Sequence, residues 1–242
     1  MTGIGTILNV ATVSVGGAFG LLLGHRLSDS SRRTVLTGLG LCSMALGVKM
    51  AFASQNFLIV IMSVLAGGII GNWLGIEMYL ATVGDRLQVK VARNGSPQAR
   101  VTEAFVASSV LFCVGPLATL GAIQDGLFGD YKLLAMKSLL DGFSAMAFTA
   151  AMGWGVLLSV ISIIAYQGGL TMAAFLLAGM FPNGLPENNP AVVELGATGG
   201  VLVLAIGLGL ADIKRIPVAD YLPALAIAPA IVLGLHWLGI AV

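Results

Sequence analysis

Residues 4–24 read IGTILNVATVSVGGAFGLLLG, and no side chain in this stretch is charged. A helix needs about 20 predominantly apolar residues to cross a hydrocarbon core roughly 30 Å thick. A strand of a membrane barrel would instead alternate apolar and polar residues over about ten positions, and this run is continuously apolar. The stretch therefore predicts a transmembrane helix.

Similar runs fill the rest of the chain of 242 residues, which is 57% hydrophobic and only 10% charged. A soluble domain carries about 25% charged residues. Turn residues and charges divide the chain into predicted spans at 4–24, 34–52, 57–80, 101–122, 131–152, 155–180, 191–211 and 221–241. We therefore expect an all-α polytopic transmembrane bundle of about eight spans. It forms one domain over 1–242, with an N-terminal segment 1–84, a cytoplasmic linker 85–100 and a C-terminal segment 101–242.

The basic residues predict the orientation. Three loops fall on one side of an eight-span bundle, and they hold nine of the twelve Lys and Arg: Arg26, Arg32, Arg33, Arg86, Lys90, Arg93, Arg100, Lys214 and Arg215. The opposite loops carry Asp125, Asp130 and Glu187 with only Lys132. The positive-inside bias makes the basic side cytoplasmic and places both termini outside. The net charge of +1 gives no indication of nucleic-acid binding.

A glycine pattern occurs twice, at an offset of 51 residues, which indicates a duplicated helical hairpin. The two copies are Gly16, Gly17, Gly20, Gly24 and Gly67, Gly68, Gly71, Gly75. Small residues four apart on one face let a neighbouring helix approach closely. We interpret Gly17, Gly20, Gly24, Gly68, Gly71 and Gly75 as packing positions, within the chain or across a homo-oligomer. The alternative is that glycines line a substrate path or allow a helix to bend.

One predicted span carries two opposite charges. Lys137 and Asp141 lie four residues apart, on one face of span 131–152, with Ser144 close by. Charged side chains at membrane depth are costly and are functional candidates. Two interpretations are open: a structural ion pair, or the coupling group of a proton- or cation-coupled carrier.

Two other spans contain helix-weakening residues. Gln167 precedes Gly168 and Gly169 near the middle of span 155–180, where a broken helix would expose backbone groups to a substrate or ion site. The alternative is close packing, with Gln167 hydrogen-bonded to a neighbour. Gly115 and Pro116 interrupt span 101–122, because proline removes one backbone hydrogen bond and kinks the helix.

The remaining polar residues suggest no chemistry. Asn9 and Asn72 are expected to form interhelical hydrogen bonds. Side chains near span ends are expected to reach the interface, namely Lys49, Glu77, Glu103 and Glu194. No catalytic motif occurs, and His25 and His236 fall on opposite sides of the predicted topology. We expect neither an enzyme nor a bound metal or cofactor.

Several segments carry a family resemblance: FCVGPLATLGAIQDGL at 112–127, KSLLD at 137–141, GWGVLLSVISIIAYQG at 153–168 and ELGATGG at 194–200. In this order and spacing they resemble the bacterial YqgA-like membrane protein family, a family of unknown function. The resemblance implies a protein of the bacterial cytoplasmic membrane, for which transport is the suspected function. It implies no substrate and no catalytic residues.

The leading hypothesis is a secondary carrier of a small solute or ion. Asp141 is its coupling carboxylate, Lys137 the charge partner, and Gln167 with Gly168 belongs to a midplane site. A channel would use the same residues. The rival is a structural or regulatory membrane protein that binds partner helices through its glycine faces. A carrier predicts a water-accessible cavity reaching Asp141, whereas a scaffold predicts a closed bundle in which both charges are satisfied.

Overall fold

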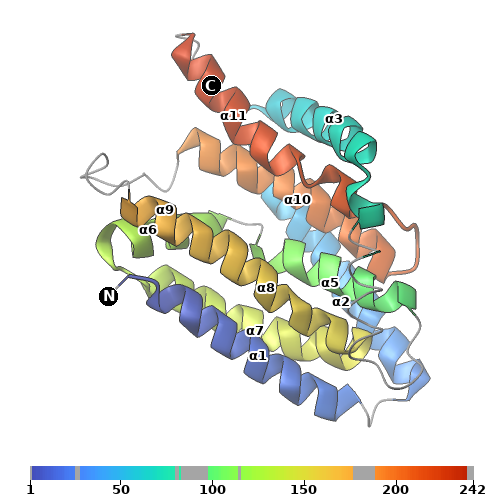
Figure 1. Cartoon of the computed structure of the whole chain (residues 1–242). Coiled ribbons are helices and arrows are strands. Elements are labelled where there is room, and N and C mark those ends of the chain that lie inside the picture. The colour runs from blue at the N-terminus through green and yellow to red at the C-terminus, as the bar shows by residue number, and fades with distance from the viewer. Residues whose placement is uncertain are drawn as a thin grey trace. The chain divides into compact units, whose positions relative to one another are not determined.

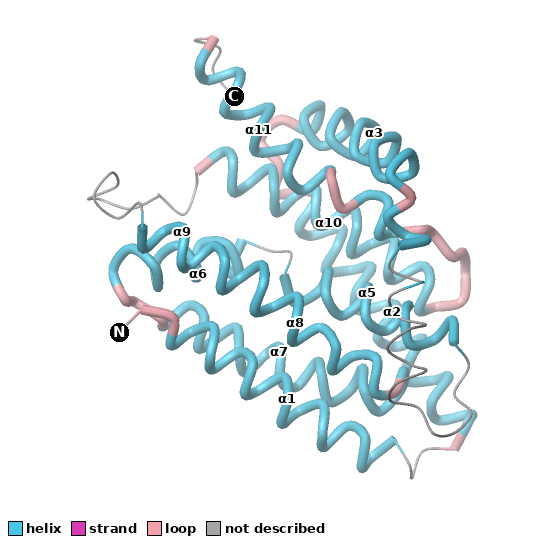
Figure 2. The backbone as a smooth tube through the Cα atoms, in the orientation of Figure 1, coloured by secondary structure: helices cyan, strands magenta, loops and turns pink. Residues whose placement is uncertain are grey.

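The computed structural model describes residues 2–24, 28–79, 82, 98–113, 116–176 and 189–238. Every regular element in these ranges is a helix, and Figure 2 shows them joined by loops. The predicted linker 85–100 lies outside the described residues, apart from its last three positions, and Gly115 lies outside them too.

The helices follow one another along the chain as Figure 1 labels them. They are α1 (Ile4–Gly24), α2 (Asp29–Ala51), α3 (Phe57–Leu74), α5 (Gln98–Cys113), α6 (Pro116–Phe128), α7 (Lys132–Met152), η1 (Trp154–Leu158), α8 (Ser159–Ile163), η2 (Ile164–Gly168), α9 (Gly169–Leu176), α10 (Pro190–Leu210), η4 (Val218–Tyr221) and α11 (Ala224–Trp237). Within the described ranges, seven helices are long and apolar enough to cross a membrane, and up to eight spans result if the bent pair α5 and α6 counts as one. The prediction of an all-α, multi-span bundle is confirmed.

The chain divides into two compact units. Unit 1 comprises Met1–Leu36 and Ser108–Glu187, and unit 2 comprises Thr37–Ala107 and Asn188–Val242. Each unit therefore combines early and late segments of the chain, so neither corresponds to one side of the predicted linker.

Unit 1 is organised around α1, which runs parallel to α7. Gly5 lies against Leu134, Gly16 against Gly142 and Gly24 against Ala150. Residue numbers rise in the same direction along both helices, so the helices are parallel. The approach is close: a Cβ atom added to Gly16 would lie 2.1 Å from the Gly142 carbonyl oxygen. Only glycine fits at such a close contact between two helices, and we call a line of these contacts a glycine seam.

Unit 2 is organised around α3 and α10. Gly67 lies against Ala224 and Gly71 against Asp220, so α3 runs antiparallel to the segment formed by η4 and α11. Along α2, Gly47 lies against Gly200 of α10. Glycine thus sets the close helix contacts of this unit as well.

Five of the six glycines interpreted as packing positions lie against helices of their own unit. Gly17, Gly20 and Gly24 do so in unit 1, and Gly68 and Gly71 in unit 2. Gly75 differs from the expectation, because it follows the last residue of α3 with a φ of 63°. Its role is to end the helix in the left-handed conformation that glycine adopts without steric cost.

The predicted break at Gln167-Gly168-Gly169 is replaced by a continuous span from Trp154 to Leu176. A π-helical turn at Ile164–Gly168 takes up the irregularity, and Gly169 keeps helical angles of φ −61° and ψ −45°. The sharp bend lies instead between α5 and α6, which make an angle of 58°. Pro116 begins α6, as expected for a residue that cannot donate to the preceding turn.

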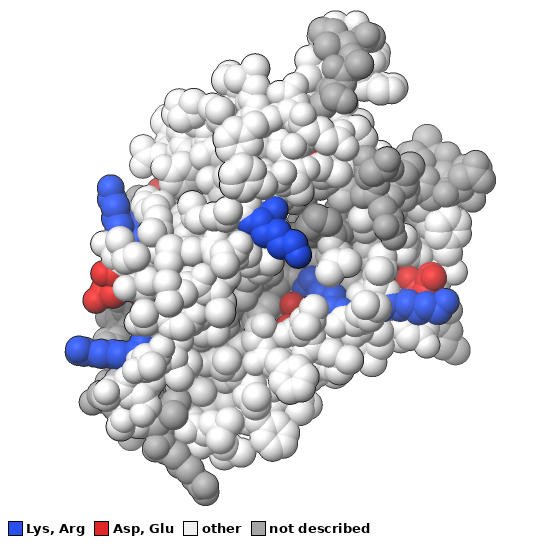
Figure 3. All heavy atoms as spheres, turned by 180° about the vertical axis from the view of Figure 1, so that it is seen from behind, with Lys and Arg blue, Asp and Glu red and all other residues white. Residues whose placement is uncertain are grey.

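Large apolar side chains point outward from the helices. Phe52, Trp73 and Trp237 are more than four-fifths exposed. Charged side chains are sparse on the face shown in Figure 3, where most atoms belong to other residues. A helix can face lipid with such apolar side chains on its outer surface. Its backbone groups need no water, because they are hydrogen-bonded within the helix.

Candidate functional site

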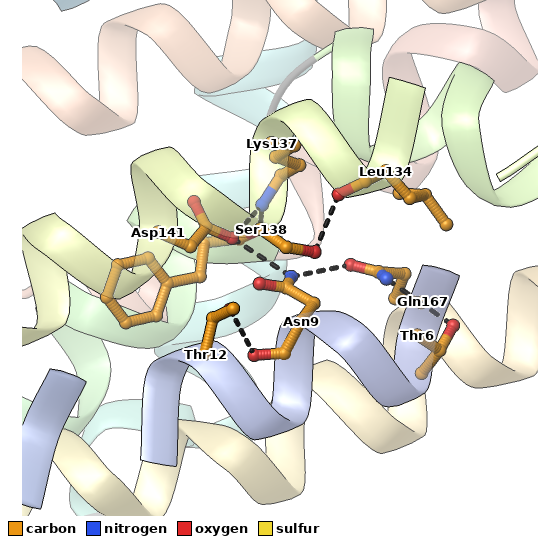
Figure 4. A network of polar contacts seen from close by, with 9 residues as sticks. Thr6, Asn9, Thr12, Leu134, Lys137, Ser138, Asp141 and Gln167 are labelled. Atoms are coloured by element: carbon orange, nitrogen blue, oxygen red, sulfur yellow. Dashed lines mark hydrogen bonds and ion pairs between the residues drawn. The ribbon is translucent and has the colours of Figure 1, made fainter. Parts of the chain in front are cut away.

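A buried network of polar side chains joins three elements of unit 1. Asn9 and Thr6 come from α1, Lys137 and Asp141 from α7, and Gln167 from η2 (Figure 4). All five are buried. The elements meet because α1 lies between α7 and the span that contains η2, with contacts to both.

The charged members of the network are Lys137 and Asp141. They are one helical turn apart and form an ion pair, with only 6% and 7% of their surfaces exposed. The Lys137 ammonium also donates to the backbone carbonyl of Phe112, at 2.6 Å. The lysine is thus held by one carboxylate and one carbonyl oxygen away from bulk water.

Asn9 connects the charged pair to the π-helical turn. Its Nδ2 donates to Asp141 Oδ2 and to Gln167 Oε1, both at 2.9 Å. Gln167 Nε2 then donates to Thr6 Oγ1 at 3.4 Å. Asn9 Oδ1 is buried, and no donor among the described residues reaches it.

The close glycine seam explains how Asn9 reaches Asp141. Gly142 directly follows Asp141 and faces Gly16 on α1, so the two backbones approach without intervening side chains. Thr12, one turn after Asn9, would lie 3.1 Å from a Cβ atom on Gly142. Any larger residue at these positions would move the asparagine away from the carboxylate.

The π-helical turn sets the direction of Gln167. Such turns insert one extra residue into a helix and often occur at functional sites. Gln167 faces Asn9, while the preceding Tyr166 shares a hydrogen bond of 3.2 Å with Thr119 of α6. The turn is therefore held by polar contacts on both of its sides.

The candidate site residues predicted from the sequence fall into two groups. Lys137, Asp141 and Gln167 meet in the network, and Gly168 follows within the same π-helical turn, with Thr6 Cγ2 3.6 Å from where its Cβ would be. Ser144 is half-buried on α7, and no hydrogen bond joins it to the network in the described part of the chain. Pro116 stands at the start of α6, where it marks the bend rather than the network.

Asn9 and Thr6 are the site residues that sequence reasoning missed. Asn9 was expected to form an interhelical hydrogen bond, but nothing in the sequence identifies Asp141 and Gln167 as its partners. Its position inside an apolar span was the available signal, because an amide in lipid must find a partner.

A second polar feature caps two helices with buried carboxylates. Asp125 of α6 accepts from the backbone N–H groups of Gly3 and Gly5, at 3.1 and 3.0 Å, before and within the first turn of α1. The carboxylate is fully buried. It satisfies backbone donors that a helix start leaves unpaired.

Glu194 of α10 does the same for α3. It accepts from the N–H groups of Gln55 and Asn56, at 2.7 and 3.0 Å, and from the Ser54 hydroxyl at 2.7 Å. Glu194 was expected to reach the membrane interface, but it is fully buried. The expectation was wrong because position along a span does not show whether another helix start lies beside it.

Apolar helices of spanning length around a buried ion-paired network define a polytopic helical membrane protein. The chain belongs to the family described as "Protein of unknown function (DUF554)", whose model matches residues 4–233. The resemblance inferred from the sequence is therefore confirmed.

Two relatives match over nearly their whole length. "Uncharacterized protein YqgA" of Escherichia coli (strain K12) is 32% identical over 228 residues, which cover 93% of this chain and 94% of the relative. "Uncharacterized membrane protein YdfK" of Bacillus subtilis (strain 168) is 25% identical over 240 residues, which cover 98% of each chain. No solved structure matches the chain.

Proposed function

We propose that the protein is a secondary carrier of a small solute or ion in the bacterial cytoplasmic membrane, coupled to a proton or a cation, with both termini outside. The observation that carries the proposal is the buried network in which Asn9 joins the Lys137–Asp141 pair to Gln167. Asp141 is the coupling carboxylate and Lys137 its charge partner. Asn9 and Gln167 link this pair to two further helical elements.

The energetic cost of the network supports this function. A buried ion pair is often no more stabilising than apolar residues of similar volume, because both charges lose their hydration. Packing alone therefore gives little reason to keep Lys137 and Asp141 in the interior of unit 1. A site that must bind and release a charged species gives such a reason.

The rival function has a specific observation against it. A scaffold that binds partner helices through its glycine faces needs those faces to be free. Gly20 lies against the Met146 carbonyl oxygen, and Gly71 lies against that of Asp220. Both faces are occupied by helices of the same chain.

The closed, buried ion pair is the arrangement predicted above for a scaffold, so the carrier proposal requires a second, open state, which a flux experiment must detect. Purified protein is reconstituted into proteoliposomes and screened for proton flux with small ions and organic acids. The Asp141→Asn variant is expected to lose the flux. Asp130→Asn is the matched control, because it makes the same chemical change at a half-exposed carboxylate outside the network. Equal flux in wild type and Asp141→Asn would refute the role of Asp141.

A native cysteine reports whether water reaches the site. Cys113 is buried and follows Phe112, whose carbonyl binds Lys137. A carrier must open a route to this point, so in a Cys42→Ser background Cys113 is expected to react with a small thiol reagent, at a rate that the transported solute changes. A closed scaffold leaves Cys113 unreactive until the protein unfolds.

A further inference from the structure

The network in unit 1 offers oxygen atoms to a positive charge. Two of them, Asp141 Oδ2 and the Phe112 carbonyl oxygen, already hold the Lys137 ammonium. Oxygen atoms of carboxylates, amides and backbone carbonyls are also the ligands of hard metal cations. The ammonium group of Lys137 thus occupies a position that suits a small cation.

The balance of donors and acceptors distinguishes a cation from an anion. Both N–H groups of Asn9 Nδ2 are committed, one to Asp141 and one to Gln167. The atom left over is an acceptor, Asn9 Oδ1, which is buried and unpaired among the described residues. The N–H groups left over belong to Lys137 and Gln167, whose nitrogen atoms already have partners, whereas Asn9 Oδ1 has none in the described part of the chain. A cation needs such a free oxygen atom. The network therefore favours a cation.

The net charge of the site indicates the valence of that cation. Asp141 is the network's single carboxylate, so it balances one positive charge. No group of three or more His, Cys, Asp or Glu that could hold a metal ion occurs in the part of the chain that the structure describes. One carboxylate with neutral oxygen atoms suits a monovalent ion better than a divalent one.

We propose that this site binds a monovalent alkali-metal cation through Asp141, Asn9 Oδ1 and the Phe112 carbonyl, in competition with the ammonium group of Lys137. This inference rests on the proposed function and names the class of ion that the carrier couples to or transports. The two positive charges exclude one another, because a single carboxylate cannot neutralise both in a site of low dielectric constant. Lys137 is then a tethered competitor that leaves the carboxylate when the metal ion arrives.

The test measures thermal unfolding of the purified full-length protein in NaCl, LiCl or KCl, with choline chloride at equal ionic strength as the reference. For wild type, at least one alkali salt is expected to raise the Tm saturably above the choline value. In Lys137→Gln the half-saturating concentration is expected to fall by a factor on the order of 100, because the competing charge is gone. In Lys137→Gln/Asp141→Asn the response is expected to disappear, while Asp130→Asn responds like wild type.

The decisive variant is Lys137→Gln. If it folds and shows the same Tm in all four salts, the inference is wrong. If it does not fold, equilibrium binding of radioactive sodium to wild type decides the matter. Saturable binding that unlabelled alkali chloride displaces and choline chloride does not would support the inference, and no saturable binding would overturn it.

The outcomes separate this inference from the proposed function. Flux that depends on Asp141, without any difference in Tm between alkali and choline salts, would support the carrier and contradict the alkali-metal site. Specific cation binding without flux across the proteoliposome membrane would support the cation site and contradict the carrier function.

Discussion

Unit 1 and unit 2 build a similar arrangement around a glycine-rich helix. The start of α1 is capped by the buried Asp125, and the start of α3 by the buried Glu194. The capped residues correspond at the 51-residue offset, since Gly5 matches Asn56. Gly17 of α1 lies against Leu157 of η1, and its equivalent Gly68 of α3 lies against Tyr221 of η4. The sequence duplication thus extends to caps and packing partners.

The two units differ in what they bury beside that helix. The equivalent of Asn9 in unit 2 is Val60, which is also buried. The neighbouring Ile59 packs with Ala228 and Val232 in an apolar cluster. At the position equivalent to Asn9, a glycine-rich helix of this kind can therefore be packed by apolar side chains, without an amide. The polar network of unit 1 is not a requirement of the architecture, which supports a functional interpretation.

The largest expected effect comes from separating the charged pair. Lys137→Met or Asp141→Leu leaves one buried charge without its partner and should lower the free energy of unfolding by about 3–5 kcal/mol. The double variant replaces the pair by apolar side chains and should recover most of that loss. Equilibrium unfolding in mixed detergent micelles measures all three variants.

The double variant also tests the comparison between the units. Restored stability without flux would mean that the pair serves function rather than folding. A double variant as unstable as either single variant would mean that unit 1 needs the charges as a brace.

A smaller loss is expected from filling the glycine seams, and it should occur in both units. An added Cβ atom would lie 2.3 Å from the Met146 carbonyl oxygen at Gly20, and 1.7 Å from that of Asp220 at Gly71. Gly20→Ala and Gly71→Ala should each cost about 1–3 kcal/mol, because the backbones must separate. Gly38→Ala is the matched control, since no atom lies within 4 Å of its added Cβ. Equal losses in all three would argue against close packing as the role of these glycines.

Asn9→Val exchanges the residue of unit 1 for its equivalent in unit 2. It removes the donor that Asp141 and Gln167 share, and should cost about 1–2 kcal/mol in unfolding free energy. The reverse change, Val60→Asn, buries an amide among apolar side chains and should also destabilise. If Asn9→Val is neutral for both stability and flux, the amide is not the connection between the charged pair and the π-helical turn.

The sequence predicted the class of fold because the signal is compositional. Long apolar runs place residues 4–24 or 57–74 in helices whatever their neighbours are. The spacing of Lys137 and Asp141 likewise predicted an ion pair, since residues four apart share a helix face. Both predictions depend only on local sequence.

What could not be predicted depends on contacts between distant segments. Asn9 and Asp141 are 132 positions apart, and Gln55 and Glu194 are 139 apart. The π-helical turn is a further case, because Gly168 and Gly169 allow a break, while the contacts of Gln167 and Tyr166 hold the span continuous. Such features depend on which helices pack against one another. The sequence of one segment does not show which helix will be its neighbour.

The smallest expected effect concerns titration of unit 2 outside its spans. Burial raises the pKa of Glu77 above its ordinary value of 4.5. The Ala219 N–H donates to its carboxylate at 3.1 Å and lowers the pKa, whereas the neighbouring charges of Asp220 and Glu103 raise it. A raised folded-state pKa means that the folded protein holds this proton more tightly than the unfolded chain. The contribution to stability is therefore complete below pH 4.5 and is lost as the pH rises through the folded-state pKa.

Glu77→Gln keeps an acceptor for Ala219 but cannot ionise, so its unfolding midpoint should change less than that of wild type between about pH 4 and neutral pH. Parallel profiles for both proteins would contradict this account.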